Sequence, residues 1–217
     1  MRHNRANLTG GLITWGLLLT VLLSSGCAST RVELSGDFPV PLVAPSPTRV
    51  AIVLSPELLN YVHTESIARG GDYSINVGAA QKLLFQRLAQ GAFDDYELTS
   101  QLAATSYDGS LVPVIEDLQF STPAQTRTDY YEVWIRYRFD IYDQTATKLG
   151  SWDLPAYGKA NVANHGNDNQ GLYAAAIAAC RDMAAMFSLN FSSAQTANQW
   201  LQPAAATTNA TQGGSGS

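Results

Sequence analysis

The sequence predicts an α+β fold in which two helices pack on one face of a mostly antiparallel sheet. First, residues 130–142 alternate between apolar and polar side chains, which is the pattern of a long, half-buried strand. Second, residues 79–90 and 172–193 carry apolar side chains at helical spacing. Third, the predicted elements follow one another as strand, helix, strand, long hairpin and helix, an order that favours helices on one side of the sheet.

The first half of the folded region is predicted to contain three short strands and one helix. Residues 50–54 are a continuous apolar run, which fits a strand buried on both faces. A helical or irregular connection over 56–67 leads to a strand over 73–77, and the helix over 79–90 ends at Gly91. A short strand over 96–99 follows, so Asp94 and Asp95 are expected in a solvated turn.

The second half is dominated by a long hairpin. A strand over 111–120 precedes the alternating strand, and residues 149–160 return beside it after a turn at 143–148, with Asp140 and Asp143 as solvated residues of the hairpin. A polar loop over 161–170 supplies side chains that can cap the last helix, which is expected to end near Ser193. The expected core face of the alternating strand consists of Tyr131, Val133, Ile135, Tyr137, Phe139 and Ile141.

Composition restricts the class of protein. The chain has 217 residues, of which 46% are hydrophobic and 14% charged, so one main domain is expected. The net charge is −5 and no run of basic residues opposes it, so we expect no nucleic acid partner. The two cysteines, Cys27 and Cys180, belong to no metal-binding pattern, which excludes a disulfide scaffold and a structural zinc site.

The first residues have the layout of a signal peptide. Arg2, His3 and Arg5 precede an apolar run over 12–23, which is followed by small residues and Cys27. Twelve helical residues reach about 18 Å, well short of the roughly 30 Å hydrocarbon core, so a permanent transmembrane helix is disfavoured. The segment over 1–26 is therefore expected to be cleaved.

The sequence Leu22-Leu23-Ser24-Ser25-Gly26-Cys27 resembles a bacterial lipobox, although Ser24 stands at the third position before the cysteine. The resemblance implies that Cys27 carries lipid and becomes the first residue of the mature chain. The residue after the cysteine is Ala28 rather than an acidic residue. In the lipoprotein-sorting pattern that this sequence resembles, a non-acidic residue here implies release to the outer membrane, with the protein facing the periplasm. The alternative is a secretory signal cut near Ala28.

The mature chain is predicted to have three parts. Residues 27–49 contain the lipidated cysteine and a tether with four prolines, although part of it could instead lie along a partner or the domain's own surface. Residues 50–202 are expected to form a single α+β periplasmic domain. The tail over 203–217 is low in complexity and is expected to be disordered.

The sequence contains no motif that indicates catalysis or a cofactor. The mature chain has only His63 and His165, both placed in connections, and it lacks the GxSxG, SxxK, HExxH and GxxxxGK[ST] patterns. Cys180 lies among alanines of the last helix and is interpreted as a small buried apolar residue. We therefore expect that the protein is not an enzyme and that it binds no cofactor and no metal.

Aromatic and basic residues on the polar face of the alternating strand are candidates for a protein interface. Tyr130, Trp134, Arg136 and Arg138 share this face, and this composition is typical of binding surfaces. The alternative is that the second helix or a loop covers them. Trp200, beyond the last helix, could cover the core or contact a neighbouring protein.

The order of elements over 50–191, together with the lipobox, is similar to YajG-like lipoproteins, to auxiliary lipoproteins of envelope lipid transport and to the lipopolysaccharide-assembly lipoprotein. Ring-forming lipoproteins of exopolysaccharide export and curli secretion are the oligomeric alternative. These resemblances imply a non-enzymatic accessory component of a cell-envelope complex or of a homo-oligomeric ring. A carrier that holds a lipid or glycan between sheet and helix, in a cavity lined by Phe139, Met183 and Phe187, is the second hypothesis.

Overall fold

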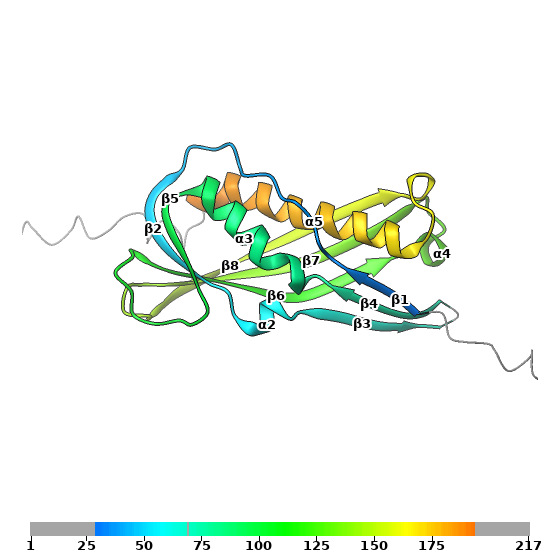
Figure 1. The fold of residues 1–217 in the computed structure, drawn as a ribbon, viewed down its shortest axis with the longest axis horizontal. Coiled ribbons are helices and arrows are strands. Elements are labelled where there is room, and N and C mark those ends of the chain that lie inside the picture. Colours follow the sequence, from blue (N-terminus) through cyan, green and yellow to red (C-terminus); the bar gives the residue numbers. More distant parts are fainter. Residues whose placement is uncertain (1–28, 69, 194–217) are drawn as a thin grey trace, which may run out of the picture.

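The computed structural model describes residues 29–68 and 70–193, which form an α+β domain elongated along one axis (Figure 1). It contains a five-stranded and a three-stranded sheet, with helices packed against them, so the predicted fold class is confirmed. The larger sheet has the strand order β5 (Phe93–Thr99), β2 (Ser46–Val53), β6 (Gly109–Ser121), β7 (Tyr130–Tyr142) and β8 (Lys148–Asn161). The smaller sheet has the order β1 (Ser29–Glu33), β4 (Gly71–Asn76) and β3 (Val62–Ile67).

Both sheets are mixed. β2 is parallel to β5 and to β6, because the chain between β2 and β5 includes a crossover through a helix, and parallel neighbours need such a connection. The longest ladders, β6 with β7 and β7 with β8, are antiparallel. The helices are α2 (Pro56–Leu59), α3 (Gly78–Ala92), α4 (Pro123–Thr126) and α5 (Asp168–Asn190), and two 3-10 turns span Val162–Asn164 and Phe191–Ser193.

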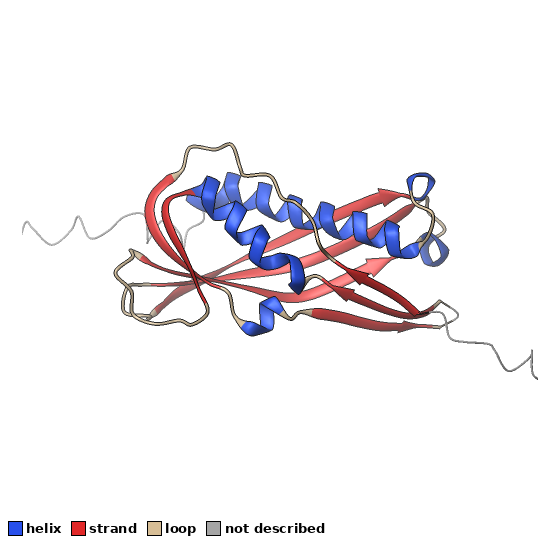
Figure 2. Ribbon diagram, viewed as in Figure 1, coloured by secondary structure: helices blue, strands red, loops and turns tan. Residues whose placement is uncertain are grey.

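The predicted hairpin is confirmed. β7 and β8 pair from Tyr130 opposite Asn161 to Tyr142 opposite Lys148. All six residues of the expected core face are at most 3% exposed, because α3 and α5 cover that face of the sheet (Figure 2). The last helix begins earlier than expected, at Asp168, since the side chain of Asn167 accepts a hydrogen bond from the backbone N–H of Gln170.

α5 lies very close to the sheet. At Gly158 of β8, an added Cβ would overlap the backbone of Ala175 and Ala179, so only glycine allows this approach. By length and composition α5 could cross a membrane, but a core helix passes the same test. Nine of its residues are buried, among them Met183 and Phe187, and we therefore describe α5 as a core helix.

The predicted tether over 27–49 is wrong for residues 29–49, which belong to the folded domain. β1 pairs in parallel with β4, and the chain then runs between α3 and α5 to the start of β2. Leu34 and Phe38 of this segment are 0% and 2% exposed. The backbone carbonyl of Asp37 accepts a hydrogen bond from Arg181 of α5 at 3.2 Å. The domain therefore begins no later than Ser29 rather than at residue 50.

Two smaller expectations are also corrected. Asp94 and Asp95 lie within β5 rather than in a turn, because this strand begins at Phe93, directly after α3. The connection over 56–67 contains the short helix α2 and also β3, whose antiparallel pairing with β4 supplies the hydrogen bonds that its sequence pattern does not indicate. The signal peptide, Cys27 and the tail over 203–217 lie outside the described residues.

Candidate functional site

The site begins with the face of the five-stranded sheet that lies opposite α3 and α5, which we call the open face. The even-numbered residues of β7 point to this face, together with alternate residues of β6 and β8. Tyr130, Trp134 and Tyr157 are 37%, 40% and 37% exposed there. No helix or loop of the described residues covers Trp134, so the alternative that the second helix or a loop covers this face is wrong.

The amino-terminal half of β7 holds an aromatic cluster on the open face. The rings of Trp134 and Tyr157, which are directly opposite in the β7–β8 ladder, have centroids 5.2 Å apart at an interplanar angle of 34°. The Tyr157 hydroxyl donates a hydrogen bond of 2.6 Å to Glu132, which together with partial burial raises the pKa of Tyr157 to about 12. Beside them, the Lys159 ammonium lies 4.9 Å from the centroid of the Tyr130 ring. These contacts hold large side chains in fixed positions while leaving them accessible.

The carboxyl-terminal half of β7 holds a network of charges. The Glu116 carboxylate contacts Arg136 at 3.1 Å and also Arg138, and Arg138 in turn contacts Asp140 at 2.9 Å. Lys148 approaches the same Asp140 oxygen at 2.9 Å. The two arginines are therefore oriented by carboxylates rather than free in solvent.

Asp140 is not the solvated residue that the sequence indicates, because it is only 6% exposed. Burial on its own raises the pKa of Asp140, but hydrogen bonds from Ser151, Lys148 and Arg138 outweigh it, and the pKa lies below its ordinary value. The Ser151 hydroxyl donates at 2.7 Å. Asp143 does lie in the turn, where its carboxylate accepts hydrogen bonds from Thr145 and Thr147.

A shallow hollow of about 290 Å³ lies between the two halves of the open face. Its lining includes Trp134, Arg136 and Gln119 of neighbouring strands, with Pro155 opposite. Aromatic and arginine side chains around a hollow are the composition of a protein-binding surface.

The structure thus brings Tyr130, Trp134, Arg136 and Arg138 onto one surface, as expected. Trp200 and Cys27 lie outside the described residues. Sequence analysis missed Tyr157, Glu132 and Glu116 as members of the site. The alternation of β8 could have indicated Tyr157, and the alternation of β6 through the buried Ile115 could have indicated Glu116. The irregularity in the β6 register after Ile115 places Asp117 on the open face as well.

A polar cluster lies in the interior beneath α3 and α5. The Tyr137 hydroxyl contacts Gln81 at 3.3 Å and the Cys180 thiol at 3.8 Å, and all three residues are fully buried. Burial raises the pKa of Cys180 to about 11, so the thiol stays protonated at neutral pH and is a packing residue, as the sequence predicts. Within the two described ranges, no three His, Cys, Asp or Glu side chains gather in a way that could hold a metal ion.

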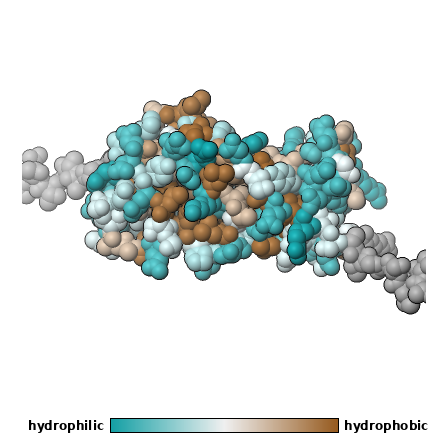
Figure 3. Space-filling view, in the orientation of Figure 1, coloured by the Kyte–Doolittle hydropathy of each residue, from teal (hydrophilic) through white to brown (hydrophobic). Residues whose placement is uncertain are grey.

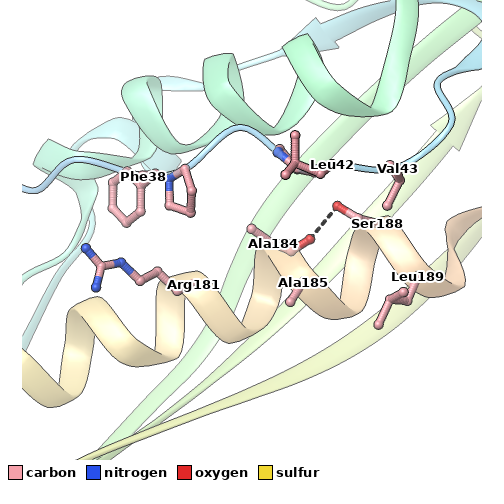
Figure 4. Close-up of a pocket in the computed structure, with 10 residues that line it drawn as sticks. Phe38, Leu42, Val43, Arg181, Ala184, Ala185, Ser188 and Leu189 are labelled. Carbon is pink, nitrogen blue, oxygen red and sulfur yellow. Dashed lines mark hydrogen bonds between the residues drawn. The ribbon is translucent and has the colours of Figure 1, made fainter.

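The cavity expected for a lipid or glycan carrier is filled by side chains. Phe139, Met183 and Phe187 are fully buried, and the rings of Phe139 and Phe187 have centroids only 5.0 Å apart. An apolar groove of about 270 Å³ lies instead at the surface, between the segment over 38–43 and α5 (Figure 4). Leu42 and Leu189 border this groove and are 101% and 69% exposed.

Comparisons with known proteins give no family. No family model matches the chain, and a search of curated proteins finds no relative.

Solved structures with a partial likeness include hypothetical protein CT253 from Chlamydia trachomatis, with 13% identity and a TM-score of 0.39 over 67% of this chain and 96% of that one. They also include a lipoprotein candidate from Caulobacter crescentus, with 7% identity and a TM-score of 0.37, over 56% of this chain and 81% of that one. Lipoprotein GNA1162 from Neisseria meningitidis has 10% identity and a TM-score of 0.28, over 56% of this chain and 88% of that one. Lipoproteins are thus among these structures, and the similarity to YajG-like lipoproteins stays a prediction.

Proposed function

We propose that this protein is a lipid-anchored, non-enzymatic component of a bacterial cell envelope that acts through protein contacts. The anchor is Cys27, on the pattern of basic, apolar and small residues that precedes it, and its place is the periplasmic side of the outer membrane. The observation that carries the binding role is the open face, where Trp134 and Tyr157 are stacked and exposed beside oriented arginines. The partner is an envelope protein complex or further copies of the same chain in a ring.

The open face suits binding because its large side chains are already ordered. Interface energy is concentrated in a few aromatic and arginine residues, and ordering them in advance lowers the entropy cost of association. Trp134 is held by Tyr157, which is itself held by Glu132, and Arg136 is held by Glu116. A partner that covers this face therefore meets few mobile side chains.

The described residues offer weak support for catalysis. The buried Cys180 thiol is protonated, and the Asp140 carboxylate is occupied by Arg138, Lys148 and Ser151. The carrier hypothesis receives no support from the interior, since side chains fill the space between sheet and α5.

The binding role is tested with the full-length lipidated protein in mild detergent. The double variant Trp134→Ala with Arg136→Ala is compared with Leu83→Ala, which removes an exposed apolar side chain from α3, on the other side of the sheet. We expect both to keep the circular dichroism and melting curve of the parent, and the double variant alone to lose partners in affinity purification or oligomer size in light scattering. A folded double variant that retains every partner and its full size contradicts the proposal.

The anchor is tested separately. Mass spectrometry should find Cys27 as the first residue, linked to lipid through a thioether, and Cys27→Ser should move the protein to the soluble periplasmic fraction. An unmodified amino terminus at Ala28 or later excludes the anchor without bearing on the open face.

A further inference from the structure

The distance along the chain between the proposed lipid and the folded domain is very short. Only Ala28 separates Cys27 from Ser29, the first residue of β1. Two residue steps of at most about 3.6 Å each place the Ser29 Cα within about 7 Å of the Cys27 Cα. A cysteine that carries acyl chains lies at the level of the lipid headgroups, and Ser29 must then lie near that level too.

β1 cannot act as a longer spacer without loss of core contacts. It pairs with β4 from Ser29 opposite Asp72 to Glu33 opposite Asn76, and Val32 is fully buried. The Leu34 backbone N–H donates to the Asn76 carbonyl at 3.0 Å, and the Asn169 side chain of α5 donates to the Arg31 carbonyl. The strand is thus fixed to both the small sheet and α5.

The position of β1 identifies one end of the molecule. The turn between β3 and β4 lies beside Ser29, because Ile67 pairs with Gly71 and Asp72 pairs with Ser29. The start of α5 lies there as well, since the Asp168 carboxylate accepts hydrogen bonds from Tyr73 of β4 at 2.8 Å and from Tyr131 of β7 at 3.1 Å. We call this end, with residues 66–68, 70–72 and 161–167, the proximal end, and Figure 1 shows it at the right, opposite the carboxyl terminus of α5.

From this geometry we infer that the proximal end lies directly on the lipid headgroups, so that the anchor fixes the orientation of the domain as well as its location. This inference rests on the proposed lipidation of Cys27. The surface chemistry of the proximal end is compatible with headgroups. In this end, residues 161–167 read Asn-Val-Ala-Asn-His-Gly-Asn and contain no Asp, Glu, Lys or Arg, whereas the part beside Ser29 carries the exposed carboxylate of Asp72. Val162 and Tyr130, at this end, are 36% and 37% exposed. On the face in view, Figure 3 shows mostly hydrophilic residues at the right-hand end of the molecule.

The opposite end, at the turn between β7 and β8, is held away from the lipid. β7 runs from Tyr130 at the proximal end to Tyr142, and thirteen strand residues span about 40 Å. Gln144, in that turn, is exposed and serves as the distal reference position.

The test uses the full-length lipidated protein with one added cysteine, at Ala68 or Asn164 in the proximal end or at Gln144 in the distal end, all three of which are exposed. A thiol-reactive fluorophore modifies the added cysteine alone, because Cys180 is fully buried and Cys27 is acylated. The protein is reconstituted in vesicles of phosphatidylethanolamine and phosphatidylglycerol that contain a lipid with a nitroxide on its headgroup. Since the ends are about 40 Å apart, we expect quenching at Ala68→Cys and Asn164→Cys to exceed that at Gln144→Cys by about threefold or more.

A spacer gives the matched control. Insertion of about ten Gly and Ser residues between Ala28 and Ser29 adds a flexible linker of about 15–20 Å and should reduce quenching at Ala68→Cys and Asn164→Cys to the Gln144→Cys level. If the protein without the spacer floats with the vesicles but is quenched equally at both ends, the proposed orientation is wrong and the anchor stands. Failure of the protein to float with the vesicles overturns the anchor and the orientation together.

Discussion

Phe38 tests whether the segment before β2 is part of the fold. Its side chain is 2% exposed and lies between α3 and α5 (Figure 4). Replacement of a core phenylalanine by alanine costs about 3–5 kcal/mol, through lost burial and the cavity left behind. In a domain of this size, each kcal/mol lowers the melting temperature by about 2–4 °C, so Phe38→Ala should melt about 6–20 °C lower.

Leu42→Ala is the matched control, because Leu42 lies in the same proline-rich segment but is 101% exposed. It should change the free energy of unfolding by less than about 0.5 kcal/mol. Urea unfolding followed by circular dichroism, in a soluble Cys27→Ser background, measures both variants. A loss below about 1 kcal/mol for Phe38→Ala would mean that the segment is a tether and that the assignment of Leu34 and Phe38 to the core is mistaken.

Three further changes test other parts of the fold. Ile135→Asp places an unpaired charge in the core at a residue that is 1% exposed, and this variant should not fold, as judged by a flat melting curve. Gly158→Ala inserts a Cβ against the α5 backbone and should cost about 1–3 kcal/mol in urea unfolding, whereas an unchanged stability would mean that α5 is not so close to β8. Asp140 has a lowered pKa in the folded state, so its ionised carboxylate stabilises the fold. This stabilisation is fully present above the unfolded-state pKa of about 3.9 and is lost as the pH falls through the folded-state pKa. Asp140→Asn should therefore be less stable than the parent at pH 7, and its melting temperature should fall less between pH 6 and pH 3.

The long hairpin could be predicted because its pattern is local. The alternation over 130–142 reports which residues face the core, and it requires no knowledge of the partner strands. The segment over 34–41 could not be predicted in the same way. Its prolines give the composition of an extended linker, and the burial of Leu34 and Phe38 depends on α3 and α5, which lie far along the chain.

The candidate site was predictable to the same extent. Trp134 and Arg136 share a face by alternation, but their partners come from other strands. Tyr157 is placed by the register of β8, and Glu116 is placed beside the two arginines by the pairing of β6 with β7. The burial of Asp140 likewise arises from Ser151 and Lys148 across the ladder, so a carboxylate that seems solvated in the sequence becomes part of a network.

The proposed orientation and the proposed binding face together restrict the partner. β7 starts at the proximal end, and Trp134 is four residues along it, or about 13 Å from that end, whereas Asp140 is about 33 Å from it. With Ser29 at the headgroups, the stacked pair Trp134 and Tyr157 therefore lies in the half of the open face nearer the lipid. A protein that binds this pair has to approach the membrane surface closely. A second anchored copy satisfies this requirement, since a twofold axis normal to the membrane brings identical patches together at the same height above the lipid. A membrane-bound partner, identical or different, thus fits the geometry better than one that stays in the periplasm far from the lipid.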